Sequence, residues 1–316
     1  MRKSFLACTI TSCLVATLPM AAEDNWLTVY GKVNIAIDKV DEDNGDDQWE
    51  INSYASRFGV KGKGAAGDGF EAFYHLEWQV DIADEAKEKN VSSRNQIVGL
   101  RGSFGEVFLG RHDTPTKSLQ KKIDLFGDQT GDIKNTFNAE KRASDIVQYS
   151  TPKISGFKGK VAFIPGEDTG TNDGLADGTS IALEYGIGAL DLGIAFDADV
   201  EAEGVDTTRL VAQYKIDAWR LGFMYQTTDF IDADGDGFMV SAKYIHGDDS
   251  FKVQIIDSDS WKAGVSSKVK YSTQTSLGWD HKMGKKFTTY GYYTMGEEGA
   301  TGDDDSIFGV GVILKF

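Results

Sequence analysis

The sequence predicts an all-β protein, a transmembrane antiparallel up-and-down β-barrel of about 16 strands. Three observations predict this fold class. Apolar and polar residues alternate along many short segments, which is the period of a β-strand with two different faces. Short and long connections alternate between these segments. The chain also contains 36 glycines and only 4 prolines, with few long stretches of helical periodicity.

The N-terminal segment, residues 1–22, is expected to be a signal peptide. Arg2 and Lys3 precede an apolar stretch that ends in small residues at its C-terminal side. This is the layout of a secretory signal, and it predicts a cut after Ala22. The remaining residues, 23–316, would then form the barrel.

Composition excludes several functional classes. Both cysteines, Cys8 and Cys13, lie in the predicted signal peptide, so the mature chain would offer no thiol to a zinc, iron–sulfur or nucleophilic site. Of 33 basic residues, 31 remain without Arg2 and Lys3, and 49 acidic residues bring the formal charge to −18. Such a charge argues against binding of nucleic acid. No other apolar run is long enough for a membrane helix, so a membrane-spanning form must be a closed barrel.

The predicted strands follow from alternation, segment by segment. In LTVYGKVNIAID (27–38), aliphatic residues share one face, and Lys32 and Asp38 lie on the other. In GFEAFYHLEWQVD (69–81), the face opposite the apolar row is polar and needs water rather than a core. Its charged or titratable residues, expected to face the lumen, include Glu71, His75 and Glu77. In chain order the predicted strands cover about 26–38, 48–63, 69–82, 91–103, 105–111, 144–151, 157–164, 178–187, 189–198, 206–216, 218–228, 236–246, 250–257, 266–281, 286–296 and 305–316.

Aromatic residues lie near both ends of many apolar faces, as in the interfacial girdles of a membrane barrel. The last segment, SIFGVGVILKF (306–316), has a wholly apolar face that ends at Phe316. It is expected to pair with the first strand, because closure of the ring removes both free sheet edges.

The connections differ at the two rims. The short ones are 64–68, 103–105, 188, 217, 247–249 and 282–285. The long ones are 40–47, 112–143, 165–177, 229–236 and 296–305. Short turns at one rim and long polar loops at the other are typical of a transmembrane barrel. A soluble β-sandwich, the alternative fold, should have similar connections at both ends.

The order of these segments resembles that of the Gram-negative trimeric porins, the 16-stranded general diffusion channels of the outer membrane. The resemblance is carried by LTVYGKVN, YASRFGVKGK, GFEAFYHLEWQVD, SSRNQIVGLRGSFGEVFLGRHDTP, GDIKN, DIVQYSTPKISGF and FGVGVILKF. It implies a passive channel for ions and small hydrophilic solutes in the bacterial outer membrane. It also implies a homotrimer in contact with outer-membrane lipid and lipopolysaccharide, and a terminal aromatic that the assembly machinery reads.

In that family a long third loop folds into the barrel, and its acidic groups face basic side chains on the wall. The matching basic positions are Lys32 in YGKVN, Arg57 in YASRFG and Arg94 in SSRNQ. Alternation independently puts Lys32 and Arg57 opposite apolar rows, but Arg94 shares the parity of Val98 and Leu100. All three could instead be surface cations that snorkel.

The connection 112–143 fits the constriction loop. Thr114 and Pro115 predict the start of a helix and Gly127 its end, with an apolar stripe between them. The candidate acids of the constriction are Asp124, Asp128 and Asp132. The PEFGGD-type motif of enterobacterial members is absent, and three lysines between 117 and 122 add positive charge. Which acids face the pore, and the sign of the ion selectivity, therefore stay open.

No cofactor, metal site or enzyme activity is expected. The DADGDG motif (232–237) matches half of a calcium-binding loop, but Lys243 stands where the loop needs a glutamate. Weak binding of divalent cations by acidic loops remains an option. The four histidines have no metal-ligand spacing, and no phosphate-binding motif is present. The alternatives to a general diffusion channel are a substrate-selective channel and a plugged adhesin or receptor barrel.

Overall fold

The computed structural model describes residues 24–43, 45, 47–84, 90–120, 123–166, 174–231, 233–264 and 269–316. The predicted signal peptide lies outside the described residues, as do Lys121, Lys122 and Asp232. Within the described part, no helix is both long and apolar enough to cross a membrane.

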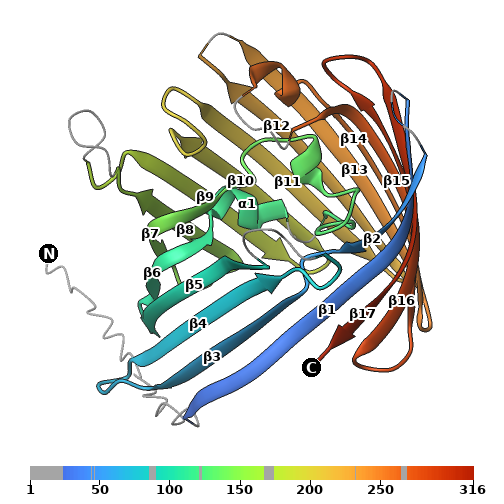
Figure 1. The fold of residues 1–316 in the computed structure, drawn as a ribbon. Helices are drawn as coiled ribbons and strands as arrows, with labels where there is room; N and C mark the ends of the chain where they lie inside the picture. The colour runs from blue at the N-terminus through green and yellow to red at the C-terminus, as the bar shows by residue number, and fades with distance from the viewer. Residues whose placement is uncertain are drawn as a thin grey trace, which may run out of the picture.

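Strands make up nearly all of the regular structure (Figure 1). They are β1 (Asn25–Glu42), β2 (Gln48–Ser53), β3 (Arg57–Ala65), β4 (Glu71–Val80), β5 (Val91–Gly102), β6 (Gly105–Asp113), β7 (Arg142–Ser150), β8 (Phe157–Ile164), β9 (Gly178–Ile187), β10 (Leu190–Ala198), β11 (Asp206–Ile216), β12 (Trp219–Asp229), β13 (Asp234–His246), β14 (Asp249–Ser258), β15 (Tyr271–Lys282), β16 (Phe287–Glu298) and β17 (Asp304–Lys315). Short helical segments between them include α1 (Pro115–Leu119), η2 (Ile133–Asn135) and η3 (Ser260–Ala263).

The strands form one closed antiparallel ring. From β3 onward each strand pairs with the next, and β17 pairs with β1 from Lys32↔Lys315 to Glu42↔Asp305. The first part of β1 pairs with β3 and the later part with β2, so β2 and β3 are two halves of one barrel strand. The 17 segments therefore make 16 barrel strands, which confirms the predicted fold class and the pairing of the last strand with the first.

The second barrel strand is interrupted, whereas the sequence predicts one continuous strand there. Ala55 has a φ of 49°, in the left-handed region, which takes it out of the sheet. Ser56 replaces the lost pairing, because its hydroxyl donates to Asn34 O at 3.0 Å and accepts from Asn34 N at 2.9 Å. The interruption also changes the phase of the alternation. Trp49 before it and Phe58 after it are both exposed on the outer face, although an unbroken strand would place an odd-numbered and an even-numbered residue on opposite faces.

The outer face of the ring is apolar. On β12 and β13, Leu221, Phe223, Tyr225 and Val240 are 36% to 46% exposed, while the intervening Met224 is fully buried on the inner side. This confirms the alternation predicted for these strands. Exposed apolar side chains in such a continuous band suit contact with hydrocarbon.

The two rims differ as predicted. Residues 103–104 join β5 to β6 and residues 217–218 join β11 to β12, whereas 114–141 and 165–177 form long connections at the other rim. The start of β1 and the end of β17 lie at the short-turn rim (Figure 1).

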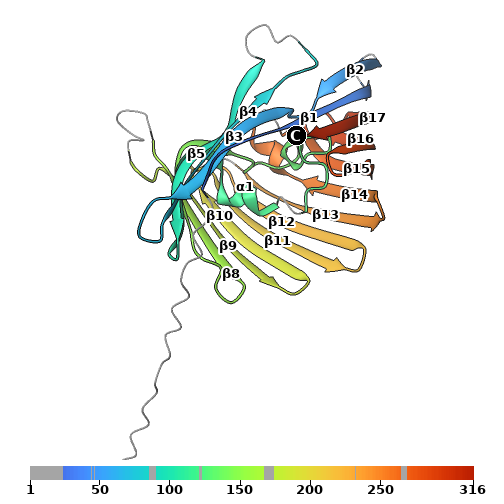
Figure 2. The same ribbon diagram turned by 90° about the horizontal axis from the view of Figure 1, so that it is seen from below.

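The connection 114–141 lies against the inward side of the ring, and Figure 2 shows α1 surrounded by strands. Its apolar side chains share one buried cluster with inward residues of β9 to β14. The cluster consists of Leu119, Ile123, Ile133, Phe137, Ala182, Ala195, Val211, Met224, Met239 and Ile256.

The helix α1 begins where the sequence predicts but is much shorter. Thr114 caps it by accepting a hydrogen bond from Lys117 N at 3.2 Å, with Pro115 at the first helical position. It ends at Leu119 rather than at Gly127, so the predicted helix end is wrong.

Packing on the wall explains this early end. A Cβ on Gly222 of β12 would lie 2.8 Å from Ile123, and one on Gly278 of β15 would lie 2.8 Å from Phe126. The two side chains therefore sit on different strands of the ring, each over a glycine. The chain runs along the wall from one glycine to the other instead of continuing as a helix.

Candidate functional site

A cluster of charged side chains lies where the connection 114–141 meets β1, β3 and β5. Asp128 of the connection accepts hydrogen bonds from Lys32 Nζ at 3.0 Å and Arg57 Nη1 at 3.1 Å. Arg94 Nη2 lies 3.7 Å from the other carboxylate oxygen. The structure thus brings the three predicted basic positions together around one predicted acid. The contacts to Lys32 and Arg57 are direct, so no water layer separates the loop from the wall there.

Glu77 of β4 is the second carboxylate of this cluster. It accepts hydrogen bonds at 2.8 Å from both Arg94 Nε and the Tyr30 hydroxyl, and Arg57 Nε lies 3.7 Å away. The five charged side chains of the cluster are 11% to 27% exposed. Partial burial makes their mutual attraction stronger than that of surface ion pairs.

A β-bulge explains why Arg94 points inward. The register between β4 and β5 shifts, so that residues 94–95 of β5 lie opposite Glu77 alone. The extra residue changes the phase of the alternation along β5. Val98, which shares the parity of Arg94 in the sequence, is 59% exposed on the outer face.

The backbone and the charge state of Asp128 are both set by its neighbours. Its φ is 68°, a left-handed conformation that aspartate tolerates better than most residues. Its backbone N–H donates to Asp132 Oδ2 at 2.8 Å, which holds the turn. Burial opposes ionisation of Asp128, but the charges of Lys32, Arg57 and Arg94 outweigh it and hold the pKa of this carboxyl below its usual range.

The other two candidate acids bind the loop itself. Asp132 caps η2 by accepting from Lys134 N at 3.0 Å. Asp124 accepts from Phe126 N at 3.1 Å and from Gln254 Nε2 at 3.2 Å. Burial, and then the negative charge of Asp132, raise the pKa of Asp124 well above its usual range. Among the three candidate acids, the contacts of the described residues join only Asp128 to the predicted basic positions.

Glu71 and His75 lie on the same polar face of β4 as Glu77. His75 Nε2 forms a hydrogen bond with the Tyr30 hydroxyl. Glu71 pairs with Lys63 at 3.3 Å, close to the short-turn rim. These three residues therefore line one strand of the inner wall, and of the three Glu77 belongs to the charged cluster.

A tyrosine cluster on the inner wall has no clear signal in the sequence. Tyr54 and Tyr292 both donate hydrogen bonds to Asp38, at 2.6 and 2.7 Å, and Tyr290 donates to Asn34 at 2.7 Å. The alternation of the first strand puts Asp38 and Asn34 on its polar face. Two of the tyrosine partners, Tyr290 and Tyr292, come from β16, which reaches β1 only across the strand that closes the ring, whereas Tyr54 directly follows β2.

A second contact that sequence reasoning missed anchors the later part of the connection. Arg209 of β11 is fully buried and donates from Nη1 to Glu140 Oε1 at 2.7 Å. It also donates to Gln226 Oε1 at 2.8 Å and to Asn138 O at 3.1 Å. Burial raises the pKa of Glu140 in spite of the attraction of Arg209. A buried ion pair in which every guanidinium nitrogen is hydrogen-bonded holds the loop in one position on the wall.

Within the residues that the structure describes, no group of three or more histidine, aspartate or glutamate side chains is arranged to hold a metal ion. The calcium-like motif is only partly covered, because Asp232 lies outside that set.

A family model described as "Gram-negative porin" matches residues 7–301. The chain is 28% identical over 184 residues to the major outer membrane protein P.IB of Neisseria gonorrhoeae, which covers 54% of this chain and 51% of that protein. The match to the outer membrane porin protein 32 of Delftia acidovorans is 27% identical over 321 residues, with 92% and 88% covered. The chain thus spans about half the length of the first curated relatives it matches.

Among solved structures, the chain is similar to an anion-selective porin from Comamonas acidovorans. The TM-score is 0.74 at 22% identity, over 92% of this chain and 99% of that one. At this identity the similarity shows a shared fold.

Proposed function

The chain belongs to the Gram-negative porin family, and we propose that it is a passive diffusion channel for ions and small hydrophilic solutes. One observation carries this proposal: a closed ring has an apolar outer face and a charged cluster on its inner face. Such a ring crosses a membrane with its backbone groups paired between strands, and its polar interior can hold water.

The protein lies in the outer membrane of a Gram-negative bacterium, the location of this family. Family and fold point to a channel rather than to an enzyme. Passage through the proposed channel requires no covalent chemistry, because solutes move down their own gradients.

The proposed role of the charged cluster is to narrow and polarise the lumen. Lys32, Arg57 and Arg94 oppose Asp128 and Glu77, and opposed charges in a water-filled channel set up a transverse field. That field orients dipolar solutes and disfavours bulky apolar ones. Since Asp128 touches Lys32 and Arg57 directly, the solute path would run beside this contact rather than through it.

The proposed assembly is a homotrimer, as the resemblance to trimeric porins implies. Outer-membrane lipid and lipopolysaccharide would cover the rest of the apolar outer face. Chemical cross-linking of detergent-extracted protein tests the assembly. A ladder that stops at three copies is expected, and a single-copy band at all cross-linker concentrations would contradict it.

Recording from planar lipid bilayers tests the channel. Purified folded protein should give stepwise increases in conductance that are proportional to the bulk conductivity of the salt solution. Folded, detergent-extracted protein that inserts but never conducts would indicate a plugged lumen, as in an adhesin or receptor barrel.

A further inference from the structure

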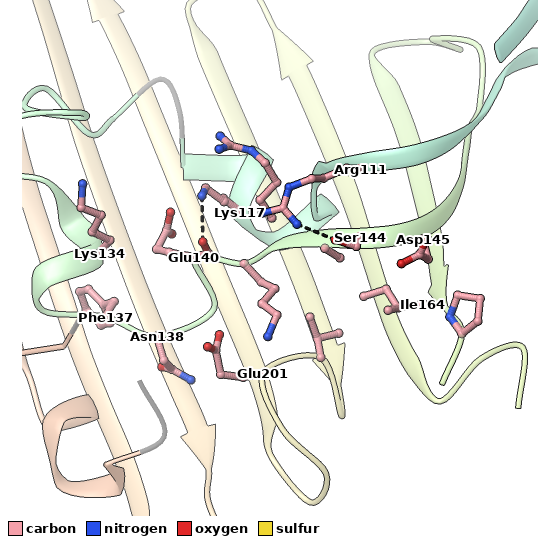
Figure 3. A pocket seen from close by; sticks show the side chains of 15 residues that line it. Arg111, Lys117, Lys134, Phe137, Asn138, Glu140, Ser144, Asp145, Ile164 and Glu201 are labelled. Carbon is pink, nitrogen blue, oxygen red and sulfur yellow. Dashed lines mark hydrogen bonds between the residues drawn. The ribbon is translucent and has the colours of Figure 1, made fainter. Parts of the chain in front are cut away.

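We propose that the lumen holds a second charged site, a subsite for small organic polyanions such as di- and tricarboxylates, in a pocket beside the connection 114–141. This inference rests on the proposed channel function. The pocket has a volume of about 620 Å³ and lies toward the long-loop rim (Figure 3). Its walls come from that connection, from β6, β7 and the end of β8, and from residues 200–201 after β10.

The lining of the pocket carries more positive than negative charge. Its basic side chains are Arg111, Lys117, Lys134, Lys141 and Arg142. Its acidic side chains are Glu140, Asp145 and Glu201. The Glu140 carboxylate is already paired at 2.7 Å with Arg209, which lies outside the lining. The chain as a whole has a formal charge of −16, so this pocket is a local reversal of sign that favours anions.

Three of these cations have acidic partners. Lys117 and Arg142 share Asp113, at 3.5 and 2.9 Å, and Lys134 pairs with Asp132 at 3.2 Å. These pairs fix the geometry of the wall. The other two basic side chains of the lining are therefore the better candidates to bind an anionic ligand.

Arg111 and Lys141 are those two cations, because neither forms an ion pair within the described residues. Arg111 donates from Nη1 to Ser144 Oγ at 2.6 Å, while its buried Nε has no hydrogen-bond partner. A buried guanidinium N–H without an acceptor is costly unless a ligand supplies one. A carboxylate is the acceptor that matches this group best, since it can take two parallel hydrogen bonds from one guanidinium.

A β-bulge lies opposite Arg111 in the wall of the pocket. The register between β6 and β7 shifts between Gly110 and His112, which leaves Ser144 and Asp145 opposite Arg111. Asp145 has a φ of 57°, in the left-handed region. Bulges often re-aim a side chain beside a functional site. The extra residue here lies in β7, the partner strand of Arg111, whereas at Arg94 it lies in the strand of the arginine itself.

The wall of the pocket is also connected to the charged cluster. Arg142 donates from Nε to Asn95 Oδ1 at 2.8 Å, and Asn95 follows Arg94 in β5. The pocket volume falls in the range of small-molecule sites. A di- or tricarboxylate has separate anionic groups that could engage Arg111 and Lys141 together, which a halide ion cannot do. The subsite would hold such a solute next to the cations of the cluster.

Citrate is a suitable probe, and block of single-channel current by citrate is the first readout. Loss of two cations from the double variant R111Q/K141Q should raise the half-blocking concentration about tenfold. R111K/K141R keeps both charges but loses the guanidinium of Arg111, so its half-blocking concentration should lie between those of the wild type and of R111Q/K141Q. Each single glutamine variant should also lie between these two values, and the single variants replace the double variant if it does not fold. The matched control K285Q/K286Q removes two exposed lysines from the turn before β16 and should leave the block unchanged.

Two results would overturn the subsite: an unchanged block in R111Q/K141Q, or a block that only R57Q/R94Q weakens, which would put citrate at the Asp128 cluster. Calorimetric titration of detergent-solubilised protein with citrate separates this inference from the channel function. Citrate binding that R111Q/K141Q weakens, in protein that never conducts, supports the subsite and refutes the channel. A protein that conducts but shows neither block by citrate nor binding of citrate would refute the subsite and leave the channel function in place.

Discussion

Arg94 and Glu77 face each other across a β-bulge, with Arg94 Nε 2.8 Å from the Glu77 carboxylate. Without the bulge, Arg94 would share the outer face with Val98. An arginine on the lipid face costs about 2–4 kcal/mol near the middle of the bilayer. One extra residue in β5 thus converts a lipid-facing position into a lumen-facing one, and the charge of the inner wall depends on it.

Replacing Arg57 and Arg94 by glutamine should shift the ion preference toward cations. Of its present cationic contacts in the described residues, Asp128 would then keep only Lys32, and Glu77 would lose both Arg57 and Arg94. From the Coulomb energy of charges a few ångströms apart in water, the cation-to-anion permeability ratio should rise about fivefold. Reversal potentials in a KCl gradient measure this ratio. An unchanged potential, or an equal shift in the control K285Q/K286Q, would remove both arginines from the ion path.

Deleting residues 123–132 should raise the conductance. The deletion removes Asp128 and the side chains that pack the loop on the inner wall at Gly222 and Gly278. At about 1 M salt the screening length is only about 3 Å, so the conductance depends mainly on the width of the pore and little on the charges of its wall. The control Asp128→Asn removes the charge but keeps the loop and should change the conductance less. A deletion variant that conducts like the wild type would mean that the loop does not limit the pore.

Replacing Arg209 by methionine should release the later part of the loop. Glu140 would stay buried without its partner at 2.7 Å, and removal of one member of a buried pair typically costs about 3–5 kcal/mol. Limited proteolysis of the connection 114–141 and thermal unfolding in detergent measure the effect. The double variant R209M/E140M, which removes both charges, should recover most of the stability. If R209M resists protease as the wild type does, the apolar cluster alone anchors the loop.

An arginine at the middle of the lipid-facing side should lower the free energy of unfolding more than an arginine at its edge. Val240 pairs with Ile255 near the centre of β13 and β14, whereas Ile216 ends β11 beside a short turn. Both Val240 and Ile216 are 46% exposed. Val240→Arg should cost about 2–4 kcal/mol and Ile216→Arg about 0–1 kcal/mol. Urea unfolding in lipid vesicles measures the difference, and equal costs would contradict a membrane-spanning position for β13.

Asp124→Asn should stabilise the protein at neutral or higher pH. Burial, and then the charge of Asp132, raise the pKa of Asp124, so its ionised form lowers the free energy of unfolding. That free energy should increase as the pH falls through the raised pKa. Asparagine stays neutral, so its advantage should be present near about pH 8 and absent near about pH 4. Urea unfolding at both pH values tests this. A less stable variant at high pH would mean that the charge of Asp124 is needed for its contacts with Phe126 and Gln254.

The sequence predicts the candidate site in part. Motif and alternation single out Lys32 and Arg57, and the structure brings both to Asp128. Their role in ion passage stays a prediction. The buried pair of Arg209 and Glu140 could not be predicted, because nothing in either local pattern shows that the two side chains meet.

The amino-acid sequence by itself determined the barrel, the number of its strands and the apolar outer face. These properties follow from alternation with a period of two and from the lengths of the connections, which are local and can be counted along the chain.

Only the tertiary structure decided which polar groups meet inside the ring. A bulge adds one residue to β5 without any signal in the sequence, and it sets the direction of Arg94. Packing of Ile123 and Phe126 over glycines of two separate strands sets the path of the loop, and so selects Asp128 rather than Asp124 to reach the basic side chains. The physical reason is that contacts between residues far apart in the chain depend on register and on the shape of the wall, and neither is encoded in a local pattern.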